Sequence, residues 1–182
     1  MVLVVPVFIF LLFAVFEFGL LMFTLGESRW SAAEGARVVS EQGILAPNCT
    51  VVVGCNRLDA PTYAGKLCDA DCQALSTINL GPLGTTSIAT VDEIDITKLR
   101  LVGGSLTPDT VAPCICTNAY ELNGKKISIS YPTSGRNVTL AAADYAQVVI
   151  KFHYNWKTGL FAQFKPPTLT ATYDVKLEPQ RF

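Results

Sequence analysis

Cysteine is the residue type with the clearest chemistry in this sequence, and all six cysteines follow an N-terminal apolar segment that ends near Phe23. They are Cys49, Cys55, Cys68, Cys72, Cys114 and Cys116. An even number confined to one side of such a segment predicts disulfides in an oxidising compartment. The spacings Cys68-x3-Cys72 and Cys114-x-Cys116 do not match the C-x2-C pairs of zinc sites, and His153, the single histidine, is remote. We therefore favour three disulfides over a metal, with Cys68 bonded to Cys72 and Cys49 and Cys55 bonded to Cys114 and Cys116.

Glu17 is the most informative single residue, because it is the only ionisable side chain between Met1 and Phe23. A carboxylate among Phe13, Phe16 and Phe18 cannot stay charged in apolar surroundings without a partner. One interpretation is a pairing with a neighbouring subunit's N-terminal amine or with a backbone donor, which would fix register during assembly. The alternative is a protonated, locally hydrogen-bonded side chain that the helix tolerates. Ionisable residues within membrane segments are usually functional, so we favour the first interpretation.

Other acidic residues and the histidine offer weaker candidates. Asp69 with Asp71, or the run Asp92, Glu93 and Asp95, supplies oxygen ligands, but neither matches the calcium-loop pattern D-x-D-x-D-G. Solvated acidic turns are far commoner, so we expect no metal site. His153 alternates onto the polar face of a predicted strand and no nucleophile motif accompanies it, so we expect neither an enzyme nor a cofactor.

Two sequences fit the acceptor pattern for N-glycosylation. Asn137-Val138-Thr139 follows a polar turn and is the better candidate, while Asn48 precedes a cysteine that we expect to be bonded. Such short patterns also arise by chance in threonine-rich sequence, so Asn137 and Asn48 are candidate sites that the pattern alone does not establish.

Composition bounds the class of protein. The chain has 182 residues, is 50% hydrophobic and 16% charged, and carries a formal net charge of −1. The absence of a basic excess argues against a nucleic-acid partner. The apolar excess lies in the first 23 residues, a run longer than the roughly 18 residues that indicate a membrane-spanning helix.

Three interpretations compete for the apolar run. It is a poor signal peptide, because it lacks a basic start and is longer than the usual apolar core. It is long enough for a plain membrane anchor, although Glu17 would then lie in hydrocarbon. The third interpretation, which we favour, is a segment that is inserted in a bilayer before assembly and later packs against copies of itself. For that role we expect a membrane or filament core built from Pro6, Phe10, Phe13, Glu17, Phe18 and Gly19.

The helical pattern continues past the apolar run to about residue 42, where Gly43 and Pro47 predict its end. A helix from about residue 3 to 42 would be roughly 60 Å long, twice the hydrocarbon thickness of a bilayer, so its second half must project. Small and apolar residues in that half predict close packing against the rest of the chain, namely Ala32, Gly35, Ala36 and Val39. Alanine also favours helices by itself, but an interior glycine does not, which supports the packing interpretation.

The remainder predicts a β-rich head. Polar and apolar residues alternate over 126–131, 151–157 and 168–177, as in sheets with one solvated and one buried face. Asn123-Gly124 predicts a hairpin turn, Ile94 and Ile96 a further strand, Val51–Val53 a short strand, and Tyr63 to Leu75 a short helix. We therefore predict an α+β fold in two domains: a long helix over 1–43, apolar first and amphipathic second, packed on a mainly antiparallel, disulfide-bonded head over 44–182.

Several blocks of sequence carry a family resemblance. The run V-L-V-V-P-V-F-I-F-L-L-F-A-V-F-E-F-G (Val2 to Gly19), then S-A-A-E-G-A-R (Ser31 to Arg37), resembles the TadE/TadG-like pilins of tight-adherence systems, a branch of the type IV pilin superfamily. The end of the chain, L-T-A-T-Y-D-V-K-L-E-P (Leu169 to Pro179), is similar to that family's closing strand. The cysteine-bearing middle is not covered.

This resemblance implies a structural subunit that is inserted in the inner membrane, processed by a prepilin peptidase and polymerised by pilus assembly machinery into a surface filament for adhesion. One departure is that family members carry a glutamate at the start of the apolar run, whereas this chain opens Met1-Val2-Leu3. Either the sequence begins downstream of the processing site or the subunit is processed differently. The rival hypothesis is a single-span protein that presents an extracytoplasmic binding module and does not polymerise.

Overall fold

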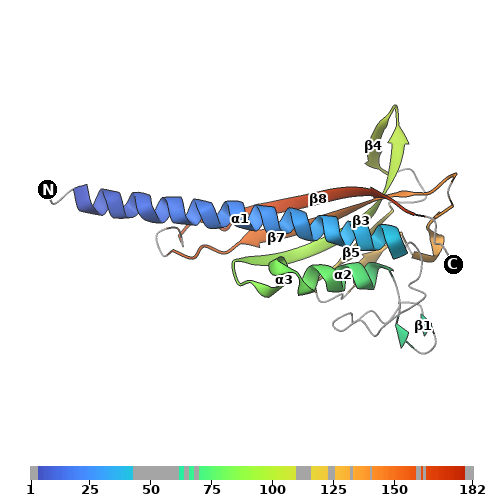
Figure 1. The fold of residues 1–182 in the computed structure, drawn as a ribbon, viewed down its shortest axis with the longest axis horizontal. Helices are drawn as coiled ribbons and strands as arrows, with labels where there is room; N and C mark the ends of the chain where they lie inside the picture. Colours follow the sequence, from blue (N-terminus) through green and yellow to red (C-terminus); the bar gives the residue numbers. More distant parts are fainter. Residues whose placement is uncertain are drawn as a thin grey trace.

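The computed structural model describes residues 4–42, 62–63, 66–67, 70–109, 116–122, 126–131, 133–139, 141–158, 161 and 163–178. The N-terminal element is a single helix, α1 (Val4–Gln42), of 39 residues, about 58 Å long at 1.5 Å per residue. Pro6 lies in its first turn, where a missing N–H costs no hydrogen bond. Figure 1 shows α1 running along the molecule, with its N-terminal part extending beyond the other elements.

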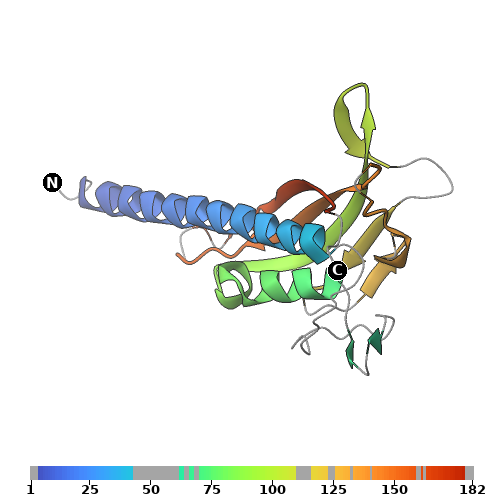
Figure 2. The same ribbon diagram turned by 45° about the vertical axis from the view of Figure 1, so that its right-hand side comes forward.

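The head is built on a six-stranded sheet in which every pairing is antiparallel. Its strands are β3 (Ala89–Val102), β4 (Ser105–Pro108), β5 (Thr117–Tyr120), β6 (Lys126–Ile129), β7 (Tyr145–Tyr154) and β8 (Thr168–Lys176). Their order is β6-β5-β3-β7-β8, and β4 pairs with the far end of β3. The β3–β4 hairpin turns at Gly103 and Gly104, whose φ angles of 59° and 87° favour glycine, and it projects from the head (Figures 1 and 2).

Smaller elements complete the head. They are the two-stranded pair β1 (Thr62–Tyr63) and β2 (Lys66–Leu67), the helices α2 (Ala70–Leu80) and α3 (Pro82–Thr85), and a 3-10 turn, η1 (Thr133–Gly135). Helix α2 has Asp71 in its first turn, where a carboxylate is favourable, and Gly81-Pro82 follow its end. Both α1 and α2 lie on the same face of the sheet (Figure 1), so the molecule has a helix layer over a sheet layer.

The hydrophobic core fills the space between these two layers. Strand β7 alternates strictly, with Ala146, Val148, Ile150, Phe152 and Tyr154 fully buried and the residues between them half-buried. This alternation is what a sheet with one covered face requires. The buried β7 side chains meet residues of α1 and α2, including Ala36, Val39 and Ile78, in one cluster.

The predicted α+β fold, with a long N-terminal helix on a mainly antiparallel sheet, is confirmed. Two boundaries differ from prediction. The short helix expected over Tyr63 to Leu75 begins only at Ala70, because Tyr63 belongs to β1. The strand expected over 151–157 ends at Tyr154 and instead begins at Tyr145, because its antiparallel pairing with β3 and β8 defines its limits. The strand predicted at Val51–Val53 and the turn residues Asn123-Gly124 lie outside the described residues, although β5 and β6 do pair as that hairpin requires.

Candidate functional site

The first half of α1 presents a nearly continuous apolar surface. Large apolar side chains that are between about half and three-quarters exposed occupy most positions from Val4 to Phe23, including Phe10, Phe13 and Phe18. Length and composition make this helix a candidate membrane span, and only 6% of its most apolar 18-residue stretch is buried against the rest of the chain. Exposure on this scale marks a surface made for lipid or for another protein.

The polar side chains of the same stretch face the opposite way. Glu17, Thr24 and Ser28 are buried against the head, while Phe16 and Phe23 point outward. The hydroxyls of Thr24 and Ser28 donate to backbone carbonyls of the preceding helical turn at 2.9 Å each. In this half of α1 the polar side chains face inward and the apolar side chains face outward. This arrangement is the reverse of that in a helix on the surface of a soluble protein, and it is found in helices with apolar surroundings.

Glu17 is held by donors of its own chain. Its Oε1 accepts hydrogen bonds from the Tyr154 hydroxyl and the Lys157 backbone N–H, both at 2.8 Å, and its Oε2 accepts the Thr158 N–H at 3.0 Å. Burial, and then its hydrogen bond to Glu17, raises the pKa of the Tyr154 hydroxyl, which keeps it protonated and donating. Backbone donors were one of the predicted partners for this carboxylate, and here they come from the loop after β7. The hydrogen bonds of Glu17 are therefore satisfied without a neighbouring subunit's amine.

That loop, the β7–β8 loop (residues 155–167, with 159, 160 and 162 outside the described residues), carries a chain of aromatic contacts. The Trp156 ring lies 5.3 Å from Tyr154 and 5.5 Å from Phe161, and Phe161 lies 6.3 Å from Phe164. Phe161 also contacts Phe10 of α1, with 6.2 Å between ring centroids. The loop therefore extends along the apolar half of α1 from Glu17 to Phe10.

The second half of α1 is packed on the head through small residues. Ala32, Ala36 and Val39 are fully buried. A Cβ placed on Gly35 would lie 2.7 Å from Cδ1 of Ile78 in α2, so glycine permits the close approach of the two helices. Near the end of α1, the Ser40 hydroxyl donates to the Lys176 carbonyl of β8 at 2.7 Å. This half of α1 is thereby fixed to the head, whereas most apolar side chains of the first half remain exposed.

A buried polar cluster links α2 to the sheet. The Arg136 guanidinium contacts the Asp71 carboxylate at 2.7 Å, and both side chains are inaccessible to solvent. The same carboxylate accepts hydrogen bonds from Asn118 at 2.9 Å and from the Tyr120 hydroxyl at 2.7 Å. Arg136 also lies over the Tyr131 ring, 4.6 Å from its centroid. Asp71 was one of the weak calcium candidates, and its place in this ion pair assigns it a structural role.

Of the six cysteines, Cys72 and Cys116 lie within the described residues. Both are buried and neither is a free thiol, each being disulfide-bonded. Cys49, Cys55, Cys68 and Cys114 lie outside the described residues, so the three-disulfide scheme and its pairing remain predictions. Of the two glycosylation candidates, Asn137 is exposed and its Oδ1 accepts hydrogen bonds from both the N–H and the hydroxyl of Thr139, while Asn48 is outside the described residues.

The acidic run on β3 is engaged by basic residues of β7 on the outer face of the sheet. Lys151 Nζ contacts both Glu93 and Asp95 at 2.7 Å. These hydrogen bonds lower the pKa of Glu93, whereas burial raises the pKa of the less accessible Asp95. His153 Nδ1 lies 2.8 Å from Asp92. Among the described residues, no group of three His, Cys, Asp or Glu side chains is arranged to hold a metal ion.

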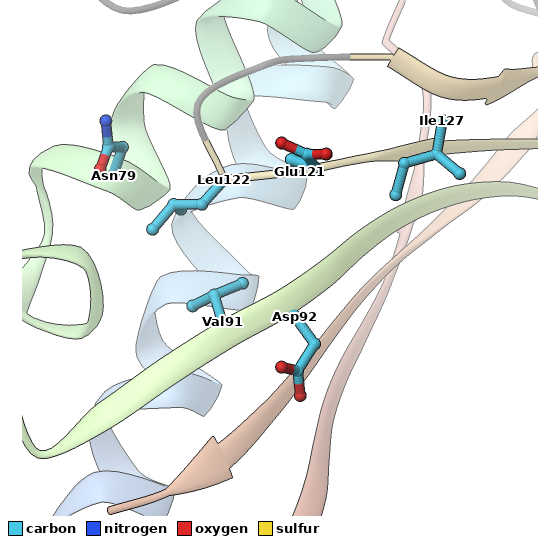
Figure 3. A pocket seen from close by; sticks show the side chains of 6 residues that line it. All are labelled: Asn79, Val91, Asp92, Glu121, Leu122 and Ile127. Carbon is cyan, nitrogen blue, oxygen red and sulfur yellow. The ribbon is translucent and has the colours of Figure 1, made fainter.

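The head also carries a pocket of about 520 Å³ near the C-terminal end of α2 (Figure 3). Two carboxylates and three apolar side chains contribute to its lining, which consists of Asn79, Val91, Asp92, Glu121, Leu122 and Ile127. An acidic and apolar lining suits a cationic, partly apolar group.

The particular partners of Glu17 and Asp71 could not be predicted from the sequence. Asp71 and Arg136 are 65 residues apart, and Glu17 and Thr158 are 141 apart, so no local pattern joins them. One signal was available: Glu17, Thr24 and Ser28 recur at helical spacing and define the inward face of α1 before any tertiary structure is known.

Comparison with known proteins agrees with the N-terminal part of this description. Residues 1–37 match the family model described as TadE-like protein. No curated protein and no solved structure matches the chain. The matched segment contains the apolar half of α1, Glu17 and the small residues Ala32, Gly35 and Ala36. The match does not extend into the head, and it does not test membership of the wider pilin superfamily. Residues 1–37 are thus similar to the TadE-like family, as the sequence resemblance predicted.

Proposed function

We propose that this chain is a structural subunit of a tight-adherence type of pilus. It is inserted in a membrane through the first half of α1, and then polymerises through the same surface into an extracellular filament at the cell surface that serves adhesion. Its partners are identical subunits, the inner membrane before assembly and, by family resemblance, a prepilin peptidase and pilus assembly machinery. The TadE-like match over residues 1–37 supports this assignment.

The observation that carries the proposal is the reversed polarity of α1. Glu17, Thr24 and Ser28 face the head while the outward surface from Val4 to Phe23 is apolar, so the environment of this half must itself be apolar. A bilayer provides that environment before assembly. A bundle of identical helices provides it afterwards, with the heads forming the outer surface.

We propose no enzymatic role and no cofactor for the chain. His153 pairs with Asp92 on the outer face of the sheet, and the pocket of Figure 3 is lined by acidic, amide and apolar side chains. The buried ion pair of Asp71 and Arg136 has no access to solvent. These groups stabilise the head.

A second candidate function is a membrane-anchored binding module that does not polymerise, and the acidic pocket favours it. Electron microscopy of material sheared from the cell surface, with an antibody against the head, distinguishes the two. The pilus proposal predicts labelled filaments that disappear when the gene is deleted. The binding-module hypothesis predicts that the label stays with the membrane fraction and that no filament carries it.

A further inference from the structure

The β7–β8 loop lies at the depth of the apolar half of α1. The outward apolar surface from Val4 to Phe23 spans 20 residues, or about 30 Å, which equals the hydrocarbon thickness of a bilayer. Counted back from Phe23 along the helix, Glu17 lies about 9 Å inside this band and Phe10 about 20 Å inside it. The loop binds Glu17 and contacts Phe10, so its aromatic residues lie within the band and not beside the head.

Several backbone and side-chain donors of this loop are bonded within the protein, as an apolar environment requires, whereas the buried Thr158 hydroxyl has no hydrogen-bond partner among the described residues. Glu17 accepts the N–H groups of Lys157 and Thr158, and the N–H groups of Phe161 and Phe164 donate to loop carbonyls at 3.3 and 2.9 Å. The Trp156 indole N–H donates to the Phe164 carbonyl at 3.1 Å. Non-helical backbone at membrane depth is stable only when its hydrogen bonds are met by protein.

Several further features of the loop suit contact with lipid, whereas the exposed side chains of Gln163 and Lys165 are polar. Pro166 and Pro167 have no backbone N–H to satisfy. The Phe164 side chain is 56% exposed, although it is large and apolar. The Lys157 ammonium reaches back to the carbonyl and hydroxyl of Ser87, so its charge lies toward the head.

We propose that the β7–β8 loop is a membrane-inserted element that enters the bilayer from the side of the head and lies beside α1 as far as Phe10, with acyl chains as its partner. Glu17 anchors the loop to the helix, and Trp156, Phe161 and Phe164 form its lipid-facing part. This inference rests on the membrane stage of the proposed function and adds a second element to the anchor. It also sets how deeply the head is held against the bilayer before assembly.

The two tryptophans of the chain provide a test with an internal control, because Trp156 lies in the loop while Trp30 lies on α1 about 10 Å beyond Phe23. The full chain is reconstituted in phosphatidylcholine vesicles whose acyl chains carry bromine, a contact quencher of tryptophan fluorescence. Trp30→Phe leaves Trp156 as the sole emitter, and Trp156→Phe leaves Trp30. A third variant adds Phe8→Trp to the double Trp→Phe background and reports whether α1 itself is inserted.

The proposal predicts that brominated acyl chains quench most of the Trp156 emission and most of the emission from position 8, and leave Trp30 largely unquenched. Quenching at position 8 without quenching of Trp156 would overturn the inference while leaving the membrane stage of the proposed function intact. If brominated lipid does not quench Trp156 but its emission changes with the number of chains per vesicle, a second copy of the chain is the partner of the loop. This result would also overturn the inference. Failure to quench position 8 would contradict both proposals.

Discussion

Replacement of Glu17 by glutamine tests the junction between α1 and the head at the level of single atoms. Oε1 accepts two hydrogen bonds, from Tyr154 and Lys157, and Oε2 accepts one, from Thr158. Glutamine retains one carbonyl oxygen, which can keep the first two hydrogen bonds. Its NH2 group then faces the Thr158 N–H, and two donors cannot bond to each other.

The size of the expected effect follows from the Thr158 N–H, which loses its acceptor in Glu17→Gln. A buried N–H that loses its acceptor costs about 1–3 kcal/mol, and this corresponds to a local opening that is about 5- to 150-fold more frequent. We expect amide hydrogen exchange at Thr158 to accelerate by that factor in Glu17→Gln, with a smaller change at Lys157. The measurement is residue-resolved exchange on the full chain in detergent.

Glu41→Gln serves as the matched control, because Glu41 is half-exposed and contacts Arg37 at 3.5 Å on the surface. Loss of such a pair costs a few tenths of a kcal/mol, so exchange in the β7–β8 loop should stay at its wild-type rate. Unchanged exchange at Thr158 in Glu17→Gln would refute the role given to the carboxylate. Equal acceleration at every amide of the head would refute its local character.

The remaining predictions concern the head and assembly. Asp71→Ala should destabilise the chain by about 3–5 kcal/mol in urea unfolding, because it leaves a buried guanidinium without its carboxylate, whereas the exposed Asp174→Ala should change little; equal effects would contradict this. The pKa of Glu93 is lowered from its usual 4.5, so Glu93 stabilises the fold above pH 4.5 and this contribution is lost as the pH falls. The pKa of Asp95 is raised, so its protonation on folding makes the free energy of unfolding increase as the pH falls. The urea midpoint should therefore fall less steeply with decreasing pH in Glu93→Gln and more steeply in Asp95→Asn, and identical pH profiles in wild type and variants would count against these assignments. Glu17→Gln should permit membrane insertion but reduce filament yield, and Glu17→Leu should reduce it further; wild-type abundance of filaments in both would mean that the residue is merely tolerated.

The sequence predicts the long helix well because the signal is local. An apolar run without a break, then residues at helical spacing up to Gly43, predicts an end close to the observed Gln42. Strand alternation is equally local. The pattern over 151–157 predicts Phe152, Tyr154 and Trp156 in the core, and the first two are buried there, whereas Trp156 lies in the loop after β7 and is only partly buried. Short elements are harder to predict, and the helix expected over Tyr63 to Leu75 begins at Ala70, because Thr62–Tyr63 and Lys66–Leu67 pair as strands.

The sites depend on contacts that local patterns do not contain. The partners of Glu17 lie in a loop whose position is set by the pairing of β7 with β8, and the partner of Asp71 lies 65 residues away in sequence. The sequence did indicate that a lone carboxylate in an apolar helix needs donors. Only the packing of the head on α1 identifies them as Tyr154, Lys157 and Thr158.

Cryo-electron microscopy of the purified full chain after detergent removal tests the central claim most directly. We predict helical filaments in which the first halves of neighbouring α1 helices pack together at the axis and the β-rich heads form the outside. A preparation that contains no filaments after detergent removal, or filaments whose core excludes residues Val4 to Phe23, would contradict this prediction.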